Sequence, residues 1–382
     1  MDNQPTDFEI ELMRQALALA ARGRGRVEPN PMVACIVARD DQVIGSGYHQ
    51  AFGQPHAEPN ALAACTQSPA GATAIVTLEP CCHTAKKTPP CVPQLIAHGI
   101  RRIVIGCLDP NPAVSGQGAA QLRGAGIEVI SAVLEPHARQ LIAPYFALTR
   151  HHRPYVTLKW AQSADGRVGG AGNTPRQISC PESQRLLHQL RSRCDAILIS
   201  ADTVLSDNPS LTVRDVPSLR TPLRVILDTH LRIPSTSRLA LTARKIPVHV
   251  FHADTLTQTP AARTLAAMGL HLHPTAVIGD HVSLPAVLQA LGDMQLTHLL
   301  IEPGPRLAQA FLDAQLADRL WVFQSPTSLH EPSGPQSPAI AFPPTTSHKI
   351  SVDTLCEYLF PTSAVYFSPD PSPDFQLFGH EH

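Results

Sequence analysis

The chain has 382 residues, enough for two domains of ordinary size, and 43% of them are hydrophobic, which is enough to fill two cores. Its formal net charge of −1 provides no basic surface for nucleic acid, so we expect no nucleic-acid partner. No apolar run approaches the ~20 residues of a membrane span, and the N-terminus Met1–Gln4 is polar, so we expect a cytoplasmic protein without a membrane partner. Nine cysteines in such a chain favour metal binding or catalysis over disulfides.

The first half alternates helices and strands. Apolar residues at helical spacing predict a helix over 7–22, and Thr6 with Glu9 suits a capping box at its start. Pro29-Asn30-Pro31 predicts a rigid turn after it. Further strands are expected at 32–38, 42–47, 73–78, 102–106 and 127–132, and further helices at 56–64, 92–98, 117–125 and 135–149. This alternation indicates a three-layer α/β/α domain over residues 1–149.

The basic, proline-ended stretch 150–154 marks the predicted domain boundary, and a second α/β domain follows over 154–382. Its expected strands are 155–160, 196–200, 223–228, 247–252, 297–302, 319–323 and 363–368, and its expected helices are 181–192, 260–268 and 304–315. Six prolines between residues 325 and 347 exclude a helix or a central strand there, so we expect a mobile loop.

Two short motifs in the first half carry the clearest chemistry. His56 is followed two residues later by Glu58, and Glu79-Pro80-Cys81 closes the strand at 73–78, with Cys91 ten residues further on. One imidazole and two thiolates are suitable ligands for Zn²⁺ and leave the fourth tetrahedral position open for water. This His-x-Glu and Pro-Cys arrangement is typical of zinc-dependent base deaminases.

The chemistry of deamination explains these residue types. Zinc lowers the pKa of a bound water from about 15.7 to about 7, which makes hydroxide available at neutral pH. Glu58 would take the proton of that water and deliver it to a ring nitrogen and then to the leaving ammonia, which is typically worth about 10²–10⁴-fold in rate. We therefore predict one Zn²⁺ per chain, held by His56, Cys81 and Cys91, with Glu58 as the catalytic acid/base.

Several alternatives stay open at this point. Cys82 and His83 are adjacent to Cys81 and could compete with it for the metal. A purely structural zinc site would have four protein ligands and no bound water. A deaminase of RNA or free nucleosides would use the same motif, although the neutral charge of the chain argues against RNA.

The first 150 residues resemble the deaminase half of the bifunctional riboflavin-biosynthesis deaminase/reductases. The matching stretches are 29–37, 45–49, 53–58, 77–81, 88–91 and 109–112, of which Thr88-Pro89-Pro90-Cys91 is the most specific. The resemblance implies a cytidine-deaminase-like fold and a substrate that carries a phosphoribosylamino group on a diaminopyrimidine ring. It places Asn30, His49 and Lys87 near that substrate. The loop between Cys81 and Cys91 is one residue longer than usual.

The second half resembles the reductase of the same family, which has a dihydrofolate-reductase-like α/β fold and uses NADPH to reduce the ribosyl chain to ribityl. The matching stretches are 158–159, 163–167, 190–191, 195–198, 203–214, 222–228 and 302–305. The resemblance implies that substrate is bound by Pro175, Arg191, Leu211, Arg214 and Glu302, and NADPH by Ala161, Gln177, Thr203, Asp207, Thr229 and Gly304. Arg191 and Arg214 could clamp a ribose phosphate, and Gly304 opens a helix suited to a diphosphate.

This half departs from the family pattern at Ala164, at Pro175, at Gln177 and in the proline-rich loop. Gln177 stands where the family usually has Trp, and the loss of an aromatic contact could cost about 0.5–1.5 kcal/mol in cofactor binding. The main hypothesis is a bifunctional enzyme that forms a homo-oligomer, a dimer or a tetramer. The alternative is a monofunctional deaminase whose second domain has become a binding or oligomerisation module.

Overall fold

The computed structural model describes residues 4–83, 88–174, 176–218, 220–361 and 363. The chain divides into two compact units, with the boundary along the sequence between His151 and His152. None of the helices in these ranges has the length and apolar character needed to cross a membrane.

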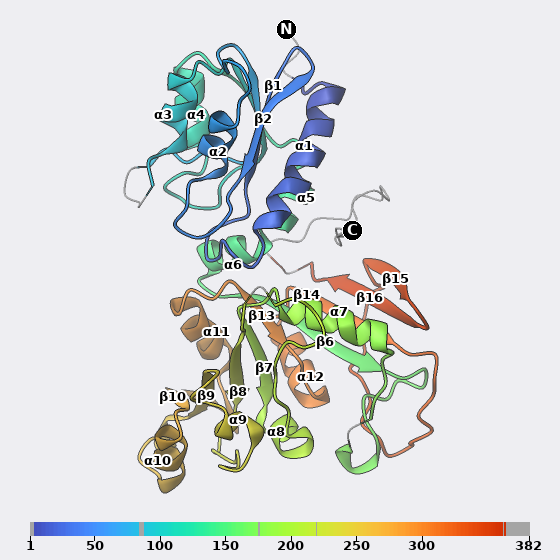
Figure 1. Ribbon diagram of the computed structural model, residues 1–382. Coiled ribbons are helices and arrows are strands. Elements are labelled where there is room, and N and C mark those ends of the chain that lie inside the picture. The colour runs from blue at the N-terminus through green and yellow to red at the C-terminus, as the bar shows by residue number, and fades with distance from the viewer. Residues whose placement is uncertain (1–3, 84–87, 175, 219, 362, 364–382) are drawn as a thin grey trace. The chain divides into compact units, whose positions relative to one another are not determined.

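The N-terminal unit is built on a five-stranded sheet with the order β2-β1-β3-β4-β5 (Figure 1). Strand β1 runs antiparallel to both of its neighbours, whereas β3, β4 and β5 are parallel. The carboxyl ends of the three parallel strands therefore lie along one edge of the sheet. The strands are β1 (Ala34–Arg39), β2 (Gln42–Tyr48), β3 (Thr73–Leu78), β4 (Arg102–Cys107) and β5 (Glu128–Ile130).

Helices cover both faces of this sheet, as expected for three layers. Side chains alternate along β1, so that Ala34 and Ile36 pack with α1 and α5 while Cys35 and Val37 pack with α2, α3 and α4 (Figure 1). The predicted capping box starts α1, because the Thr6 hydroxyl accepts a hydrogen bond from the Glu9 amide at 3.2 Å. The helices are α1 (Asp7–Ala20), α2 (Ala57–Ala63), α3 (Cys91–Ala97), α4 (Gln117–Gly124), α5 (Glu135–Leu141) and α6 (Ala143–His151), and a 3₁₀ turn, η1, spans Ala21–Gly23.

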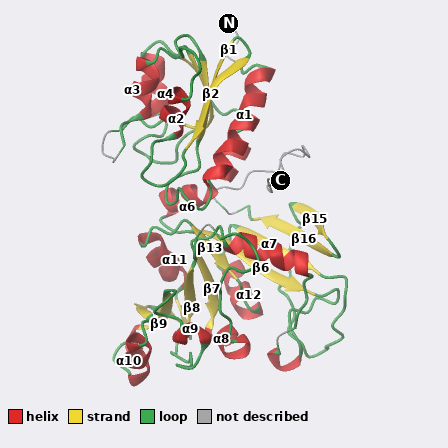
Figure 2. Ribbon diagram, viewed as in Figure 1, coloured by secondary structure: helices red, strands yellow, loops and turns green. Residues whose placement is uncertain are grey.

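The C-terminal unit contains a nine-stranded sheet with the order β10-β9-β8-β7-β13-β6-β14-β16-β15 (Figure 2). The seven strands from β10 to β14 are parallel, and β16 and β15 add antiparallel pairings at one side. Its strands are β6 (Tyr155–Gln162), β7 (Ala196–Ser200), β8 (Leu223–Leu227), β9 (Val248–Ala253), β10 (His271–Thr275), β13 (His298–Ile301), β14 (Arg319–Gln324), β15 (Thr346–Ile350) and β16 (Asp353–Leu359). The hairpin β11 (Val277–Ile278) and β12 (His281–Val282) stands apart from this sheet.

The main core of this unit lies between the sheet and two of its helices, where Leu291 and Phe311 pack against Leu158, Leu198 and other strand residues. These strands are buried and apolar along most of their length, as parallel strands usually are. The helices are α7 (Pro181–Arg191), α8 (Ala201–Asp207), α9 (Arg238–Leu241), α10 (Pro260–Ala267), α11 (Leu284–Asp293) and α12 (Pro305–Asp313), with 3₁₀ turns η2 (Ala171–Asn173) and η3 (Asp254–Leu256).

The structure corrects several predicted elements. The helix predicted over 135–149 is two helices, α5 and α6, broken at Ile142, just before Pro144, which cannot donate a helical hydrogen bond. Helices α8, α9 and α11 and strands β10, β11, β12, β15 and β16 were not predicted, and most of them are short or follow Gly- and Pro-rich turns. The strand predicted over 363–368 lies outside the described residues except for Ser363, which is a bend.

The proline-rich segment has no helix or strand before Thr346, as predicted, but it is tied to the stretch after β6. The Asp165 carboxylate accepts hydrogen bonds from the amides of Leu329 and His330, at 3.0 and 3.1 Å. Further along, Arg167 donates to the Gly334 carbonyl at 2.6 Å, and Arg176 pairs with Glu331 at 2.9 Å. The mobility of this loop stays a prediction.

Two glycines of β2 explain how α2 reaches the sheet. A Cβ added to Gly45 would lie 2.6 Å from the Ala61 carbonyl oxygen, and one added to Gly47 would lie 2.7 Å from the Asn60 Cβ. The backbone of α2 therefore rests directly on β2, which only glycine permits. The positions of His56 and Glu58, at the start of α2, depend on this close approach.

We predict that Gly47→Ala lowers the free energy of unfolding of the N-terminal unit by about 1–3 kcal/mol, because the new methyl group overpacks the contact between α2 and β2. Zinc binding should weaken with it. Gly124→Ala is the matched control, since a Cβ there meets nothing within 4 Å. Denaturant unfolding and zinc titration measure both effects, and a Gly47→Ala protein as stable as the control would contradict the prediction.

Candidate functional site

The structure brings the three predicted zinc ligands together. His56 immediately precedes α2, Cys81 follows β3, and Cys91 is the first residue of α3. The His56 Nδ1 atom lies 3.6 Å from the Cys81 Sγ and 3.5 Å from the Cys91 Sγ. All three ligand atoms lie within 4.8 Å of one another, close enough to share one metal ion.

The donor set fits zinc. Two of the three ligands, Cys81 and Cys91, are buried, and one nitrogen with two sulfur donors suits a zinc ion that keeps one open position. In the part of the chain that the structure describes, neither Cys82 nor His83 belongs to this group. The amide of Cys91 donates to the Cys81 Sγ at 3.4 Å, which favours a thiolate at Cys81.

Glu58 lies in the first turn of α2 and is almost completely buried, with 3% of its surface exposed. Burial raises the pKa of its carboxyl group, and the nearby Cys81 raises it further. A carboxyl group with a raised pKa can take a proton at neutral pH and give it back, as the predicted acid/base requires.

Two residues predicted to contact the substrate, Asn30 and His49, lie beside the zinc ligands. The His49 Nδ1 donates to the Pro55 carbonyl at 3.0 Å, so its Nε2 accepts from the Asn30 Nδ2 at 3.1 Å. Burial lowers the pKa of His49, and the imidazole of His56, 5.4 Å away between ring centroids, lowers it further. His49 is therefore neutral, and its hydrogen bond fixes the backbone just before His56. Lys87 lies outside the described residues.

The sequence analysis missed the structural role of Glu79. Its buried carboxylate accepts hydrogen bonds from the amides of Asp109, Gly116 and Ala119, at 3.2, 2.9 and 3.0 Å. It thereby holds the loop after β4 and the start of α4 against the chain that leads to Cys81. The only feature of the sequence that could have indicated this role of Glu79 is its place in the Glu-Pro-Cys motif.

Asp109 is a second buried carboxyl group at this edge of the sheet. Burial raises its pKa to about 6, although it accepts hydrogen bonds from the Asn111 amide at 2.8 Å and the Tyr145 hydroxyl at 3.0 Å. The hydrogen bond from Tyr145, a residue of α6, thus connects that helix to Asp109 in the loop after β4.

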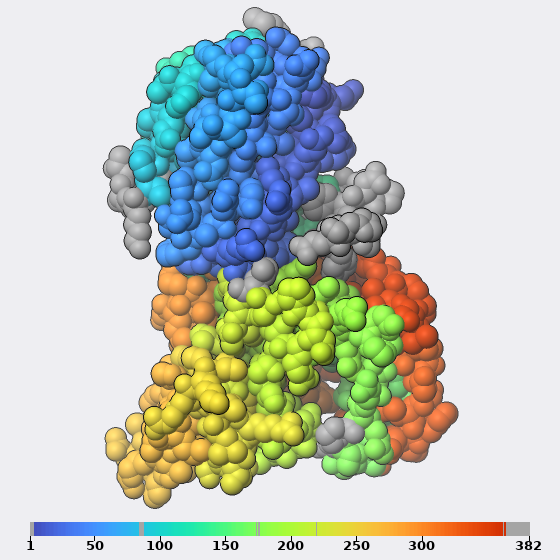
Figure 3. All heavy atoms as spheres, in the orientation of Figure 1, coloured from blue at the N-terminus to red at the C-terminus, as the bar shows by residue number. Residues whose placement is uncertain are grey.

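In the C-terminal unit, several predicted ligand-binding residues lie at the carboxyl ends of parallel strands. Ala161 lies near the end of β6, Thr203 in α8 just after β7, Thr229 after β8, and Glu302 and Gly304 after β13. Ligands of open α/β sheets bind at this edge. The space-filling view shows this unit hollowed between its green and its yellow-green residues (Figure 3). A Cβ added to Gly304 would meet nothing within 4 Å, so open space lies before α12 for a cofactor diphosphate.

The structure pairs two residues that were predicted to bind substrate. Arg191 donates from Nε and Nη2 to the two carboxylate oxygens of Glu302, at 2.6 and 2.7 Å, and from Nη1 to the Thr212 carbonyl at 3.2 Å. One edge of the guanidinium thus faces Glu302, and the phosphate clamp predicted from Arg191 stays a prediction. Arg214 is exposed, and its amide donates to the His188 Nδ1 at 3.1 Å.

Lys159, for which no role was predicted, interacts electrostatically with both members of this ion pair. It is half-buried in β6, with its Nζ 5.3 Å from the centroid of the Phe323 ring. Burial lowers the pKa of the ammonium group to about 8, against the opposing effect of the Glu302 carboxylate. The signal in the sequence was a charged residue within a mostly apolar strand.

The remaining predicted positions are less informative. Leu211 is buried with a positive φ of 49°, whereas Gln177 and Asp207 are exposed. The Thr229 hydroxyl accepts from the Val282 amide at 3.1 Å. Pro175 lies outside the described residues. The ligand contacts of all these residues stay predictions.

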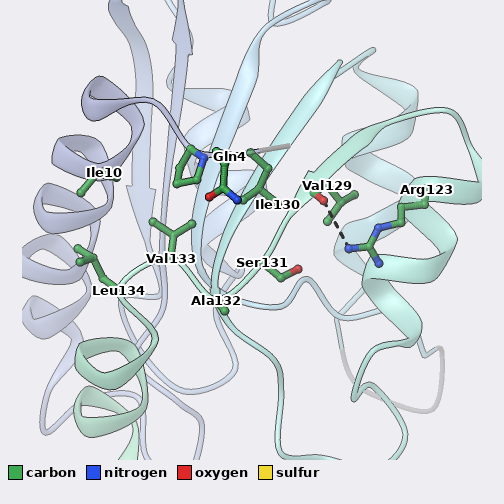
Figure 4. Close-up of a pocket in the computed structure, with 10 residues that line it drawn as sticks. Gln4, Ile10, Arg123, Val129, Ile130, Ser131, Ala132, Val133 and Leu134 are labelled. Atoms are coloured by element: carbon green, nitrogen blue, oxygen red, sulfur yellow. Dashed lines mark hydrogen bonds between the residues drawn. The ribbon is translucent and has the colours of Figure 1, made fainter. Parts of the chain in front are cut away.

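A separate cavity of about 360 Å³ lies beside β5 in the N-terminal unit (Figure 4). Its walls combine polar and apolar surface, and Arg123, a basic side chain among them, donates to the Val129 carbonyl at 3.4 Å. It includes none of the zinc ligands and not Glu58. Its lining residues are Gln4, Pro5, Ile10, Arg123, Val129, Ile130, Ser131, Ala132, Val133 and Leu134.

Comparison with known proteins gives a match for each unit. Residues 6–107 match the cytidine and deoxycytidylate deaminase zinc-binding region, and residues 154–338 match the RibD C-terminal domain. The chain is 39% identical to the riboflavin biosynthesis protein RibD of Aquifex aeolicus, over 85% of this chain and 89% of that protein. It is 37% identical to RibD of Escherichia coli, over 83% and 87%.

Solved structures agree with these sequence matches. Acinetobacter baumannii RibD, form 2, superposes with a TM-score of 0.80 at 32% identity, over 92% of this chain and 98% of that one. A diaminohydroxyphosphoribosylaminopyrimidine deaminase/5-amino-6-(5-phosphoribosylamino)uracil reductase from Thermotoga maritima gives a TM-score of 0.79 with the same identity and coverage. These matches confirm the predicted fold class.

We predict that Glu79→Gln lowers the free energy of unfolding of the N-terminal unit by about 1.5–3 kcal/mol, because hydrogen bonds to a buried carboxylate are lost or weakened. Glu11→Gln, at an exposed side chain of α1, is the control. Chemical denaturation followed by circular dichroism measures both variants. Equal stability of the two would refute the role of Glu79.

Proposed function

We propose a division of labour between the two units, from the premise that the chain belongs to the RibD family of riboflavin-biosynthesis proteins. The protein is a bifunctional enzyme with a zinc-dependent deaminase activity and an NADPH-dependent reductase activity. In our proposal, residues 1–149 deaminate 2,5-diamino-6-(5-phosphoribosylamino)pyrimidin-4(3H)-one. Residues 154–382 then reduce the ribosyl chain of the product to ribityl.

The observation that carries the proposal is the convergence of His56, Cys81 and Cys91 beside a buried glutamate. Bound zinc would supply hydroxide at neutral pH. Glu58 takes one proton from the water and passes it to the ring nitrogen next to the carbon under attack. It then takes the second proton, from the hydroxyl group added to that carbon, and gives it to the amino group, which leaves as ammonia. We assign the orientation of the ring to the neutral His49 and to Asn30, which share a hydrogen bond beside His56. Buried surroundings would strengthen their interactions with the ring.

In the second unit, bound NADPH supplies the hydride. Hydride addition at C1 of the ribose would break the bond between C1 and the ring oxygen, and that oxygen would need a proton to become a hydroxyl group. We assign the proton to Lys159, whose ammonium group has a pKa of about 8 and can act as an acid near neutral pH. Glu302, paired with Arg191, keeps a negative charge near that ammonium group.

The assembly and the location of the protein are also proposals. A homo-oligomer of two or four chains is supported by the edge strands β10 and β15, each of which pairs with one neighbour only among the described residues. Sedimentation velocity would contradict it by finding a monomer. A cytoplasmic location is supported by the cysteine content, because nine cysteines, two of them in the zinc site, fit metal binding in a reducing compartment better than disulfides. Labelling of the protein in fractionated cells would test this location.

We predict that Glu58→Gln lowers the deamination rate by about 10²–10⁴-fold, because glutamine cannot carry the proton. The reaction mixture would contain the protein, the phosphoribosylaminopyrimidine substrate and NADPH, with products identified by mass spectrometry. The native protein should give a product that is deaminated and reduced.

The two activities serve as controls for each other. Glu58→Gln should retain its zinc and should still reduce substrate that has already been deaminated. Full deamination by Glu58→Gln would overturn the assigned role of the glutamate. A deaminated but unreduced product from the native protein would favour the alternative in which the second unit is a binding module, and an unchanged substrate in zinc-loaded native protein would overturn the proposal.

We predict that the reductase rate falls as the pH rises through about 8, because Lys159 loses its acidic proton there. The pKa is lowered in the folded protein, so the acid form is present below that pH. Lys159→Met should lower the rate by about 10²-fold or more and remove this pH dependence. Lys245→Met, at an exposed lysine, should change neither. A rate that stays constant from pH 7 to 9.5 would exclude Lys159 as the acid.

A further inference from the structure

The imidazole ring of His56 is contacted on two sides by a single short stretch of chain. Its Nδ1 lies 3.5 Å from the Cys91 Sγ, and its Nε2 lies 3.2 Å from the Thr88 Oγ1. These two contacts come from residues only three positions apart. Thr88 itself is half-buried.

The tetrapeptide Thr88-Pro89-Pro90-Cys91 explains how both contacts arise. A residue that precedes proline is restricted to extended backbone, and this applies to Thr88 and to Pro89. Pro90 adopts φ −63° and ψ 147° just before α3, so that Cys91 becomes the first residue of the helix. The stiff segment therefore holds the Thr88 hydroxyl beside Nε2 of His56 and the Cys91 sulfur beside Nδ1 of the same ring.

The chemistry of the ring assigns the direction of the hydrogen bond. Nδ1 lies close to both sulfur atoms, so it is the nitrogen that faces the metal position. A histidine that binds a metal through one nitrogen carries its proton on the other, and that N–H needs an acceptor. The Thr88 hydroxyl oxygen is placed to accept it.

We propose that Thr88 is a positioning residue of the zinc site. Its hydroxyl oxygen holds the proton of His56 on Nε2, so that the lone pair of Nδ1 points at the metal and the ring does not rotate. The inference rests on the proposed assignment of His56, Cys81 and Cys91 as the ligands. It adds a specific reason for threonine in the Thr-Pro-Pro-Cys motif beyond the shape of the turn.

Three variants of the full-length protein test this role. Thr88→Val keeps the shape of the side chain and removes the acceptor, Thr88→Ser keeps the hydroxyl, and Thr66→Val removes a hydroxyl of the same unit that donates instead to the Ile44 carbonyl. The zinc dissociation constant is measured by competition with a chromogenic chelator. We expect zinc binding about 10–100-fold weaker in Thr88→Val, and little change in Thr88→Ser and Thr66→Val.

Each outcome decides something different. Weaker zinc binding in Thr88→Val that is restored in Thr88→Ser supports the proposal, because a role in the turn alone would not depend on the hydroxyl. Native affinity in Thr88→Val, or equal losses in the valine and serine variants, overturns it. A native protein that binds no zinc would instead overturn the ligand assignment, which separates the failure of the proposed function from the failure of this inference.

A measurement on the native protein keeps the proposal testable even if Thr88→Val fails to fold. In the zinc-loaded protein labelled with ¹⁵N at histidine, NMR spectra report which imidazole nitrogen carries the proton. We expect the His56 proton on Nε2, with slow exchange against solvent. A proton on Nδ1 would overturn the proposal, and so would a proton on Nε2 that exchanges as fast as one on an exposed histidine.

Discussion

The deaminase site depends on the direct contact between the backbone of α2 and strand β2. Glycines at positions 45 and 47 remove the side chains that would otherwise hold the two elements apart. The start of α2 then lies next to the carboxyl end of β3, so that His56 and Glu58 meet Cys81. The second cysteine ligand, Cys91, arrives at the start of another helix, and the α/β framework thus provides ligands from three separate segments.

The sequence predicted the zinc site best, because histidine, glutamate and cysteines must occur there together at set spacings. The metal ligands, the acidic helix residue and the order of elements in the first unit follow from spacing and alternation, which reflect local geometry. Glu79 could not be assigned in this way, because its three hydrogen-bond donors lie 30 to 40 residues away. The same holds for the pairing of Arg191 with Glu302, which are 111 residues apart. Short strands such as β10 depend on their neighbours in the sheet rather than on their own pattern.

The two units use buried charge in different ways. In the first, carboxyl groups with raised pKa values, Glu58 and Asp109, stand near thiolates that would carry negative charge. In the second, Arg191, Glu302 and Lys159 combine both signs, so that burial shifts the pKa of the lysine while the glutamate limits that shift. Glu58, the proposed acid/base, and Lys159, the proposed acid, thus have different electrostatic surroundings.

The attachment of the proline-rich loop to the stretch after β6 has a consequence for binding. Asp165, Arg167 and Arg176 each bond this loop, so much of its conformational entropy is already lost before a ligand arrives. Its prolines reduce the freedom of the unfolded chain as well, so that folding restricts it less. A ligand that contacts this loop would therefore not have to order it.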